Sequence, residues 1–325
     1  MTNTDANNSI PLVVFPTQKP SQILESEWIA LEGATKDIKV MSIDCSVDTV
    51  TCIAMDAVSY PAIRLYHGDN QFTRYRGRPK ASLILSFIRR ANNPIISQIT
   101  PETLPTFTTS DDITFTAQLP LHEAPLYEWQ YRDLAEKHHL QYSFAILPPS
   151  PSQFRSVIRC RNNPNDENYT LKELWLVGAM DELVRQCSTP LILEPTRKGI
   201  SELGRTASQD GKTLVLHYFA SSEKQKDDYK KEMLGLAKRY EAGVFFTVID
   251  VNVHALMPGL AGLELKGGVG DGVLVEDLMG GEVFPYSGTG NITAEKLEAF
   301  LKDVMGGKAK AWGAVRAGEG RHDEL

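Results

Sequence analysis

The residues of this sequence best suited to redox chemistry are its four cysteines, Cys45, Cys52, Cys160 and Cys187. A catalytic dithiol needs two cysteines in a Cys-x-x-Cys spacing at the start of a helix, where the helix N-terminus lowers the pKa of the attacking thiol. No two cysteines have that spacing, and none precedes Cys45. The sequence therefore predicts no dithiol exchange site of this kind.

No spacing of cysteine and histidine predicts a metal site. His138 and His139 are adjacent, and adjacent residues of a helix point in different directions, so the two cannot ligate one ion together. We expect neither a metal nor an organic cofactor.

The C-terminal residues carry a cellular address. The sequence closes on the tetrapeptide HDEL, formed by His322, Asp323, Glu324 and Leu325. At a free C-terminus this is a retrieval signal of the endoplasmic reticulum, read by a receptor. Sequons for N-glycosylation at Asn7, Asn168 and Asn291 suit the same compartment. We therefore expect residence in the endoplasmic reticulum lumen, with the HDEL receptor as one partner.

Other features of composition narrow the function classes. The net charge is −7 and no run of Lys or Arg occurs, which argues against nucleic acid or a membrane surface as partner. The longest apolar stretches, such as Val244–Val251, have strand length, so no membrane span is expected. The segment MTNTDANNSIPLVV lacks the apolar stretch of a signal peptide, and the reason for this stays open.

Strand and helix patterns recur along the chain at nearly equal spacing. Apolar strands are predicted at Leu12–Phe15, Ile113–Gln118 and Leu214–Phe219, and second strands follow at Ile38–Asp44, Tyr142–Leu147 and Val244–Val251. Helical spacing of apolar residues lies between them. It is formed in the first repeat by Leu24, Trp28 and Leu31, and in the third by Tyr229, Met233, Leu236, Ala237 and Tyr240.

Strand–helix–strand units with short connections predict parallel pairing, with helices on both faces of a sheet. The predicted fold class is α/β, with three tandem domains of one architecture at 1–95, 96–197 and 198–308, and a flexible tail at 309–325. A single large α/β domain is the alternative, and the repeat argues against it.

Three segments resemble the protein disulfide isomerase family, whose modules have the thioredoxin fold. Residues 42–90, SIDCSVDTVTCIAMDAVSYPAIRLYHGDNQFTRYRGRPKASLILSFIRR, are similar to the second half of its first catalytic domain. QCSTPLILE resembles the end of its second domain, and residues 212–251 resemble its third, peptide-binding domain. The order of these three segments corresponds to the first three domains of the family, called a, b and b′, and the resemblance covers roughly residues 10–310.

The resemblance implies that the redox site has been lost. Counted on from Phe15 without a gap, the two catalytic cysteine positions are Lys19 and Gln22. The family's buried Glu and its Lys partner correspond to Val13 and Ser42, so these accessory groups are also replaced. Pro61 corresponds to the cis-proline beside the site.

The resemblance also implies a structural disulfide between Cys45 and Cys52, which an oxidising compartment permits. A redox-switching dithiol is the alternative for this pair. Cys160 and Cys187 are interpreted as two small buried apolar side chains, with a disulfide between them as the alternative.

The third domain of the family carries an apolar pocket for unfolded segments. The corresponding candidates here are Leu203, Leu214, Leu216, Phe219, Leu256, Leu260 and Leu263, although buried strands need apolar residues in any case. The hypothesis is a redox-inactive chaperone or escort for unfolded or partly folded polypeptides or for one lumenal partner. The alternatives are a subunit that anchors a glycoprotein-processing enzyme, and a residual isomerase that uses Cys45 and Cys52.

Overall fold

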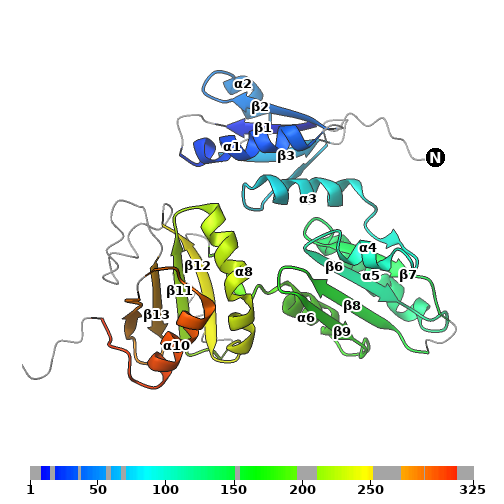
Figure 1. Cartoon of the computed structure of the whole chain (residues 1–325). Coiled ribbons are helices and arrows are strands. Elements are labelled where there is room, and N and C mark those ends of the chain that lie inside the picture. Colours follow the sequence, from blue (N-terminus) through cyan, green and yellow to red (C-terminus); the bar gives the residue numbers. More distant parts are fainter. Residues whose placement is uncertain are drawn as a thin grey trace, which may run out of the picture. The chain divides into compact units, whose positions relative to one another are not determined.

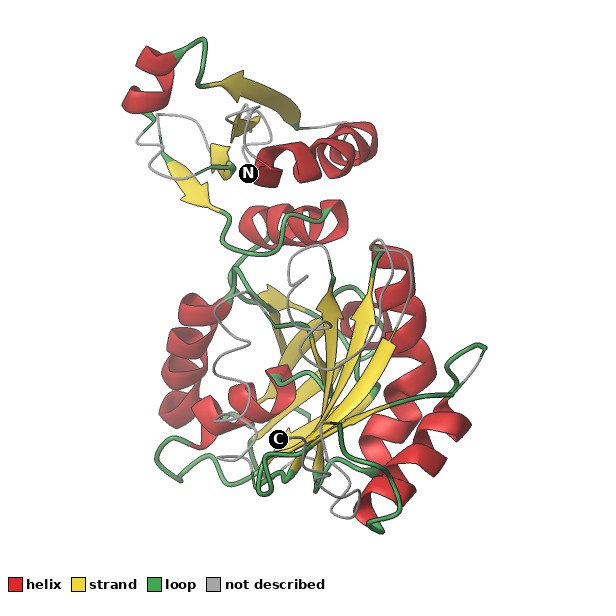
Figure 2. Ribbon diagram, turned by 90° about the vertical axis from the view of Figure 1, so that its left-hand side faces the viewer, coloured by secondary structure: helices red, strands yellow, loops and turns green. Residues whose placement is uncertain are grey.

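The computed structural model divides into two compact units, Met1–Ser188 and Thr189–Leu325 (Figure 1). It describes residues 9–14, 19–35, 38–55, 60–66, 71–150, 154–195, 211–251, 272–288 and 290–312, without the side chains of 9–14, 19, 20, 22 and 23. The first unit holds two mixed sheets and the second holds one. Figure 2 shows helices beside the strands of the sheets, as the predicted α/β class requires.

The first module is built on a sheet with the strand order β2-β1-β3-β4. Its strands are β1 (Ser9–Val14), β2 (Lys39–Asp44), β3 (Ala62–Tyr66) and β4 (Phe72–Arg74), and its helices are α1 (Lys19–Ala34), α2 (Thr49–Ala54) and α3 (Ala81–Asn92). The predicted apolar face of α1, formed by Leu24, Trp28 and Leu31, is buried and packs with residues of β3 and α3.

The second module has the strand order β5-β7-β6-β8-β9. Its strands are β5 (Ser97–Gln98), β6 (Ile113–Gln118), β7 (Ser143–Leu147), β8 (Val157–Asn162) and β9 (Glu167–Leu171), and its helices are α4 (Leu104–Thr108), α5 (Ala124–His138) and α6 (Ala179–Ser188). Phe115 and Phe144 stack in its core with their ring centroids 5.0 Å apart. The Tyr131 hydroxyl lies 3.0 Å from the carbonyl oxygens of Phe115 and Ala145.

Helix α3 joins the first two modules through a buried ion pair. Arg90 Nε donates to Asp111 Oδ2 at 2.8 Å, and its Nη2 donates to Asp111 Oδ1 at 3.1 Å. Its Nη1 also donates to the carbonyl oxygen of Leu140 at 2.9 Å. A bidentate Arg–carboxylate pair fixes orientation as well as distance, so it holds the end of α3 against the second module.

The third module has the strand order β10-β12-β11-β13-β14. Its strands are β10 (Ile192–Leu193), β11 (Leu214–Ala220), β12 (Val244–Asp250), β13 (Gly272–Asp277) and β14 (Val283–Pro285), and its helices are α8 (Glu223–Arg239) and α10 (Ala294–Met305). Both helices pack on the sheet face that carries Leu214, Leu216 and Tyr218. The predicted helix over 223–240 is confirmed to within one residue.

One connectivity is used three times. The central strand, β1, β6 or β11, leads to a helix and pairs in parallel with the following strand, β2, β7 or β12. It pairs antiparallel with the first strand of a hairpin, β3, β8 or β13, after which a helix closes the module. This repeated mixed sheet confirms the predicted tandem thioredoxin-like architecture.

Two predicted boundaries need correction. Ile192 and Leu193 were assigned to the second domain, but they form β10 and pair in parallel with β12 of the third sheet. The third module therefore begins before residue 198, because hydrogen bonding and not chain position decides where a short strand belongs. The predicted tail from 309 includes a residue that is bonded to the third sheet, since Trp312 N donates to the carbonyl oxygen of Val283 at 2.7 Å.

Candidate functional site

The position of the family's redox site lies between β1 and α1 of the first module. β1 ends at Val14, and α1 begins at Lys19, so the predicted positions Lys19 and Gln22 belong to the first turn of this helix. That is where a helix N-terminus would stabilise a thiolate. The residues found there have no thiol, and their side chains lie outside the described part of the chain.

The structure does not bring Val13 and Ser42 together. In the parallel pair, Val13 lies opposite Ile43, and Leu12 lies opposite Ser42. Neighbouring positions on a strand belong to opposite faces of the sheet, so Val13 and Ser42 do not share a face. A count shifted by one residue, to Leu12, restores the pairing and moves the lost cysteine positions to Gln18 and Ser21. Neither count places a cysteine at the start of α1.

A disulfide closes the turn that follows β2. The Cα atoms of Cys45 and Cys52 are 5.8 Å apart, and both residues are 2% exposed. The pair is covered by Ile43, Met55 and Tyr60, among others. Disulfide exchange needs an incoming thiolate to reach a sulfur atom. At this depth the bond acts as a cross-link between β2 and α2.

The proline next to this disulfide has the unusual backbone geometry of its family counterpart. The Tyr60–Pro61 peptide bond is cis and lies just before β3. Tyr60 packs against the Cys45–Cys52 pair. The first module thus has a cis-proline and a buried disulfide, but no free cysteine among its described residues.

The second pair of cysteines is also bonded, which corrects the interpretation of Cys160 and Cys187 as separate side chains. Their Cα atoms are 6.3 Å apart, and the residues are 1% and 0% exposed. The bond ties β8 to α6, and Asn162 Nδ2 donates to the carbonyl oxygen of Cys187 at 2.7 Å beside it. The pairing depends on which face of α6 packs on β8, which spacing in the sequence does not reveal.

The proposed peptide-binding residues of the third module divide into two groups. Leu203, Leu256, Leu260 and Leu263 lie outside the described residues. Leu214, Leu216 and Phe219 are at most 8% exposed and belong to the core of the sheet. They line no surface because β11 is the central strand, with a neighbour on each edge. A peptide site in this module must therefore use residues other than Leu214, Leu216 and Phe219.

A buried polar cluster lies on the sheet face opposite α8. His217 Nδ1 is 3.0 Å from Thr247 Oγ1, and His217 Nε2 is 3.2 Å from Glu276 Oε2. The hydrogen bond with His217 lowers the pKa of Glu276, against the effect of burial. This order of groups resembles a nucleophile–base–acid relay, but Thr247 is fully buried. A hydroxyl closed off from substrate cannot attack it, so the cluster satisfies buried polar groups.

A second charged cluster anchors the start of α8 and was missed in the sequence. Lys226 is 3% exposed, and its Nζ lies 2.5 Å from Glu223, 2.7 Å from Asp250 and 3.2 Å from Glu194. Burial alone lowers the pKa of Lys226, but the hydrogen bonds from Nζ to Asp250 and Glu223 raise it above its ordinary value. The cluster stays charged and holds the helix to the sheet.

Other predicted features can be placed briefly. Asn168 and Asn291 are exposed, as a glycosylated Asn must be, while Asn7 and the segment His322–Leu325 lie outside the described residues. Within the described ranges, no three His, Cys, Asp or Glu side chains are grouped as metal ligands. Among the helices that the structure describes, none has the length and apolar character needed to cross a membrane.

The chain is similar over most of its length to fungal protein disulfide isomerases. It is 22% identical over 292 residues to the enzyme of Humicola insolens, covering 87% of this chain and 56% of that protein. Identity to the Aspergillus niger enzyme is 20% over 292 residues, covering 87% and 55%. The chain thus spans about half the length of the curated relatives it matches. No protein-family model matches it.

Solved structures of similar proteins include human ERp44 and a fragment of ERp72. ERp44 in crystal form II has 14% sequence identity and a TM-score of 0.40, covering 94% of this chain and 85% of that structure. The bb fragment of ERp72 has 16% identity and a TM-score of 0.43, covering 67% of this chain and 100% of the fragment.

Proposed function

We propose that this chain is a protein disulfide isomerase-like protein of the endoplasmic reticulum lumen that lacks thiol–disulfide exchange and binds non-native polypeptides or one lumenal partner. The state of the cysteines carries the proposal. All four form disulfides and are at most 2% exposed, and none stands at the start of α1. Exchange needs an accessible sulfur and a thiolate, whereas polypeptide binding needs only apolar surface.

Two further observations support the proposal. Similarity to fungal isomerases extends over 87% of the chain, so the tandem modules correspond to modules of proteins that act on other polypeptides. The tetrapeptide His322–Leu325 would retain the protein in the endoplasmic reticulum lumen when a receptor reads it at a free C-terminus.

Redox inactivity is tested by reduction of insulin disulfides with dithiothreitol as the reductant. We expect the full chain to reduce insulin no faster than dithiothreitol alone, because no sulfur is accessible. The double variant Cys45→Ala, Cys52→Ala should give the same rate. A rate above the background that this variant loses would overturn redox inactivity and establish the residual isomerase.

Polypeptide binding is tested by aggregation of chemically denatured rhodanese. We expect the full chain to suppress light scattering and the variant Leu260→Glu to lose much of that effect, since Leu260 is a candidate from the family's peptide pocket. The matched control is Val47→Glu, because Val47 is a large apolar residue that is 83% exposed in the first module. Equal scattering with and without the chain would contradict a general chaperone role. A stoichiometric complex with one lumenal enzyme in that case would support the anchoring role.

Localisation is tested in cells with the chain placed behind a cleavable signal peptide. Deletion of residues 322–325 should release the protein into the medium, while the full sequence should be retained. Equal secretion of both forms would contradict retrieval through HDEL.

A further inference from the structure

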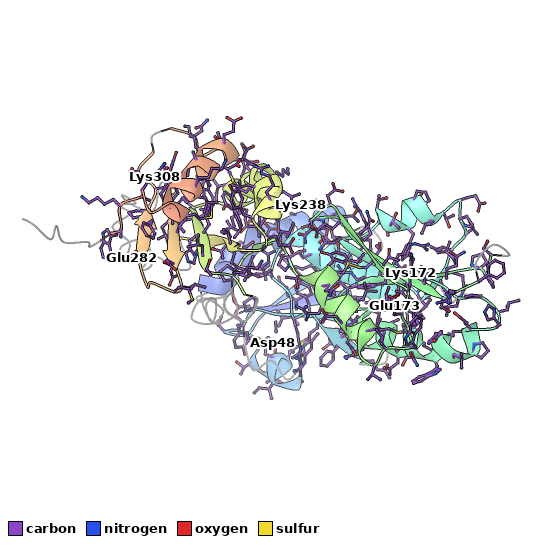
Figure 3. The ribbon with its side chains drawn as sticks, turned by 90° about the horizontal axis from the view of Figure 1, so that it is seen from below. Asp48, Lys172, Glu173, Lys238, Glu282 and Lys308 are labelled. Carbon is purple, nitrogen blue, oxygen red and sulfur yellow. A yellow bond between two sulfur atoms is a disulfide. The ribbon has the colours of Figure 1, made fainter. Side chains whose placement is uncertain are left out.

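Three consecutive large apolar side chains of the second module are exposed to solvent. Trp175, Leu176 and Val177 are 58%, 55% and 104% exposed. They lie between β9 and α6, one residue after Glu173, which is labelled with Lys172 in Figure 3. Apolar surface exposed to water lacks the stabilisation that burial provides, and contiguous exposed apolar surface marks an interaction site.

The fold imposes this exposure, because the loop is held by its own backbone. Leu176 N donates to the carbonyl oxygen of Glu173 at 3.2 Å, and Ala179 N donates to that of Leu176 at 3.1 Å. Gly178 then turns the chain into α6 with a φ of +78°, which side chains disfavour. The preceding Leu174 is 4% exposed and pins the loop to the core. The apolar run is therefore presented in a fixed conformation.

Helix α5 supplies the opposite wall of a cleft. Trp129 is 64% exposed, and Asp133 lies one turn later on the same side of the helix. Trp129 and Trp175 line a cleft of about 330 Å³ whose inner surface includes the buried side chains of Leu134, Leu174 and Met180. We call this space the Trp cleft. Its volume is that of a small ligand pocket.

The charges around the Trp cleft favour a cationic ligand. Among its described lining residues, Lys137 Nζ lies 3.0 Å from Asp181 Oδ1, so these two charges offset each other. Asp133 remains as an acidic group that no other basic residue of the lining offsets. Indole rings also attract cations to their faces.

We propose that the Trp cleft binds an extended polypeptide segment in which an aromatic or aliphatic side chain lies beside an Arg or Lys. The apolar side chain enters between Trp129 and Trp175, and the cation lies against an indole face near Asp133. This proposal rests on the proposed function, polypeptide binding, and deepens it. It adds a binding surface in the second module, which contains none of the peptide-binding residues predicted from the resemblance.

The test measures binding of a fluorescein-labelled peptide, Gly-Ser-Phe-Arg-Leu-Arg-Ser-Gly, to the full chain by fluorescence anisotropy. Trp residues at the centre of interfaces dominate binding. We therefore expect the double variant Trp129→Ser, Trp175→Ser to weaken binding at least ~10-fold. The matched control is Trp312→Ser, because Trp312 is 51% exposed in the other unit and should leave binding unchanged. Since the replaced side chains are exposed, circular dichroism should show that all variants fold.

Charge preference is the second arm of the test. A peptide with Glu in place of Arg should bind the chain more weakly, and Asp133→Lys should reverse that preference. Asp228→Lys, at an exposed acidic residue of α8, is the control and should not reverse it. Binding that the Trp double variant leaves intact, equal affinity for both peptides, or no binding of either would overturn the proposal. So would a dimer of the chain that Trp175→Ser dissociates, since the cleft would then be filled by a second copy.

The two proposals can fail separately. Loss of rhodanese protection in Leu260→Glu, with peptide binding intact, assigns the main chaperone surface to the third module and leaves the Trp cleft standing. Peptide binding unaffected by the Trp variants, with rhodanese protection intact, removes only the Trp cleft.

Discussion

Cys160 and Cys187 tie β8 to α6 across a longer loop than Cys45 and Cys52 close after β2. Their sequence separations are 27 and 7 residues. A cross-link removes conformational entropy from the unfolded chain, and the amount grows with loop length. The Cys160–Cys187 bond, which the family resemblance does not imply, should therefore stabilise the fold more than the Cys45–Cys52 bond does.

Removing each disulfide should reveal this difference. The variant Cys160→Ala, Cys187→Ala should lower the free energy of unfolding of the second module by ~3–4 kcal/mol, and Cys45→Ala, Cys52→Ala should lower that of the first by ~2–3 kcal/mol. Hydrogen exchange in increasing urea, read separately for β8 and β2, measures both values. Unchanged protection of β8 in the first variant would show that the Cys160–Cys187 bond contributes nothing.

Tyr75 should titrate unusually late. Burial raises the pKa of Tyr75 to about 12, and its hydroxyl donates to the carbonyl oxygen of Arg78 at 2.6 Å. An unfolded tyrosine ionises near pH 10, so the contribution of Tyr75 to stability is complete below about pH 10 and is lost as pH rises through about 12. The difference in absorbance at the phenolate band between the chain and Tyr75→Phe should show this step. A step near pH 10 would contradict it.

The start of α8 illustrates how a helix is fixed to its sheet in this fold. Ser222 caps the helix, and its Oγ accepts a hydrogen bond from Gln225 N at 3.2 Å. One turn in, Lys226 reaches Asp250 at the end of β12 and Glu194 just after β10. Since these strands neighbour each other in the sheet, one ammonium group joins three elements.

Breaking this cluster should destabilise the second unit. Lys226→Met removes the buried ammonium group beside Asp250 and Glu194, while Lys230 Nζ still lies 2.8 Å from Glu194 Oε2. Loss of one partner of a buried pair costs ~3–5 kcal/mol. The matched control Lys224→Met, at an exposed lysine of the same helix, should change the free energy of unfolding by less than ~0.5 kcal/mol. Urea-dependent hydrogen exchange in α8 and β12 measures both, and equal effects would contradict the assigned role.

Across the whole molecule, no cysteine should react with a thiol reagent before the disulfides are reduced. All four cysteines of the chain are in disulfides, and none is free. We therefore expect no reaction with Ellman's reagent in the native state or after denaturation without reductant, and four thiols per chain after reduction. Two thiols in the denatured, unreduced chain would show that one of the pairs is open.

The sequence by itself determined the repeated architecture and much of the local structure. The apolar spacing of Leu24, Trp28 and Leu31 marks a buried helix face, and this is where the structure buries it. The helix predicted over 223–240 is α8, because the periodicity of its apolar residues is a local signal. The absence of a Cys-x-x-Cys spacing is likewise a property of the sequence alone.

Only the tertiary structure decided which distant residues meet. The Cys160–Cys187 bond, the membership of β10 in the third sheet, the charges around Lys226 and the cleft that Trp129 and Trp175 line all depend on register and on which helix face packs where. Local propensity carries no information on such contacts, since they form between segments separated by many residues. The absence of a Cys-x-x-Cys spacing could therefore be read from the sequence, whereas the proposed Trp cleft could be found only in the folded chain.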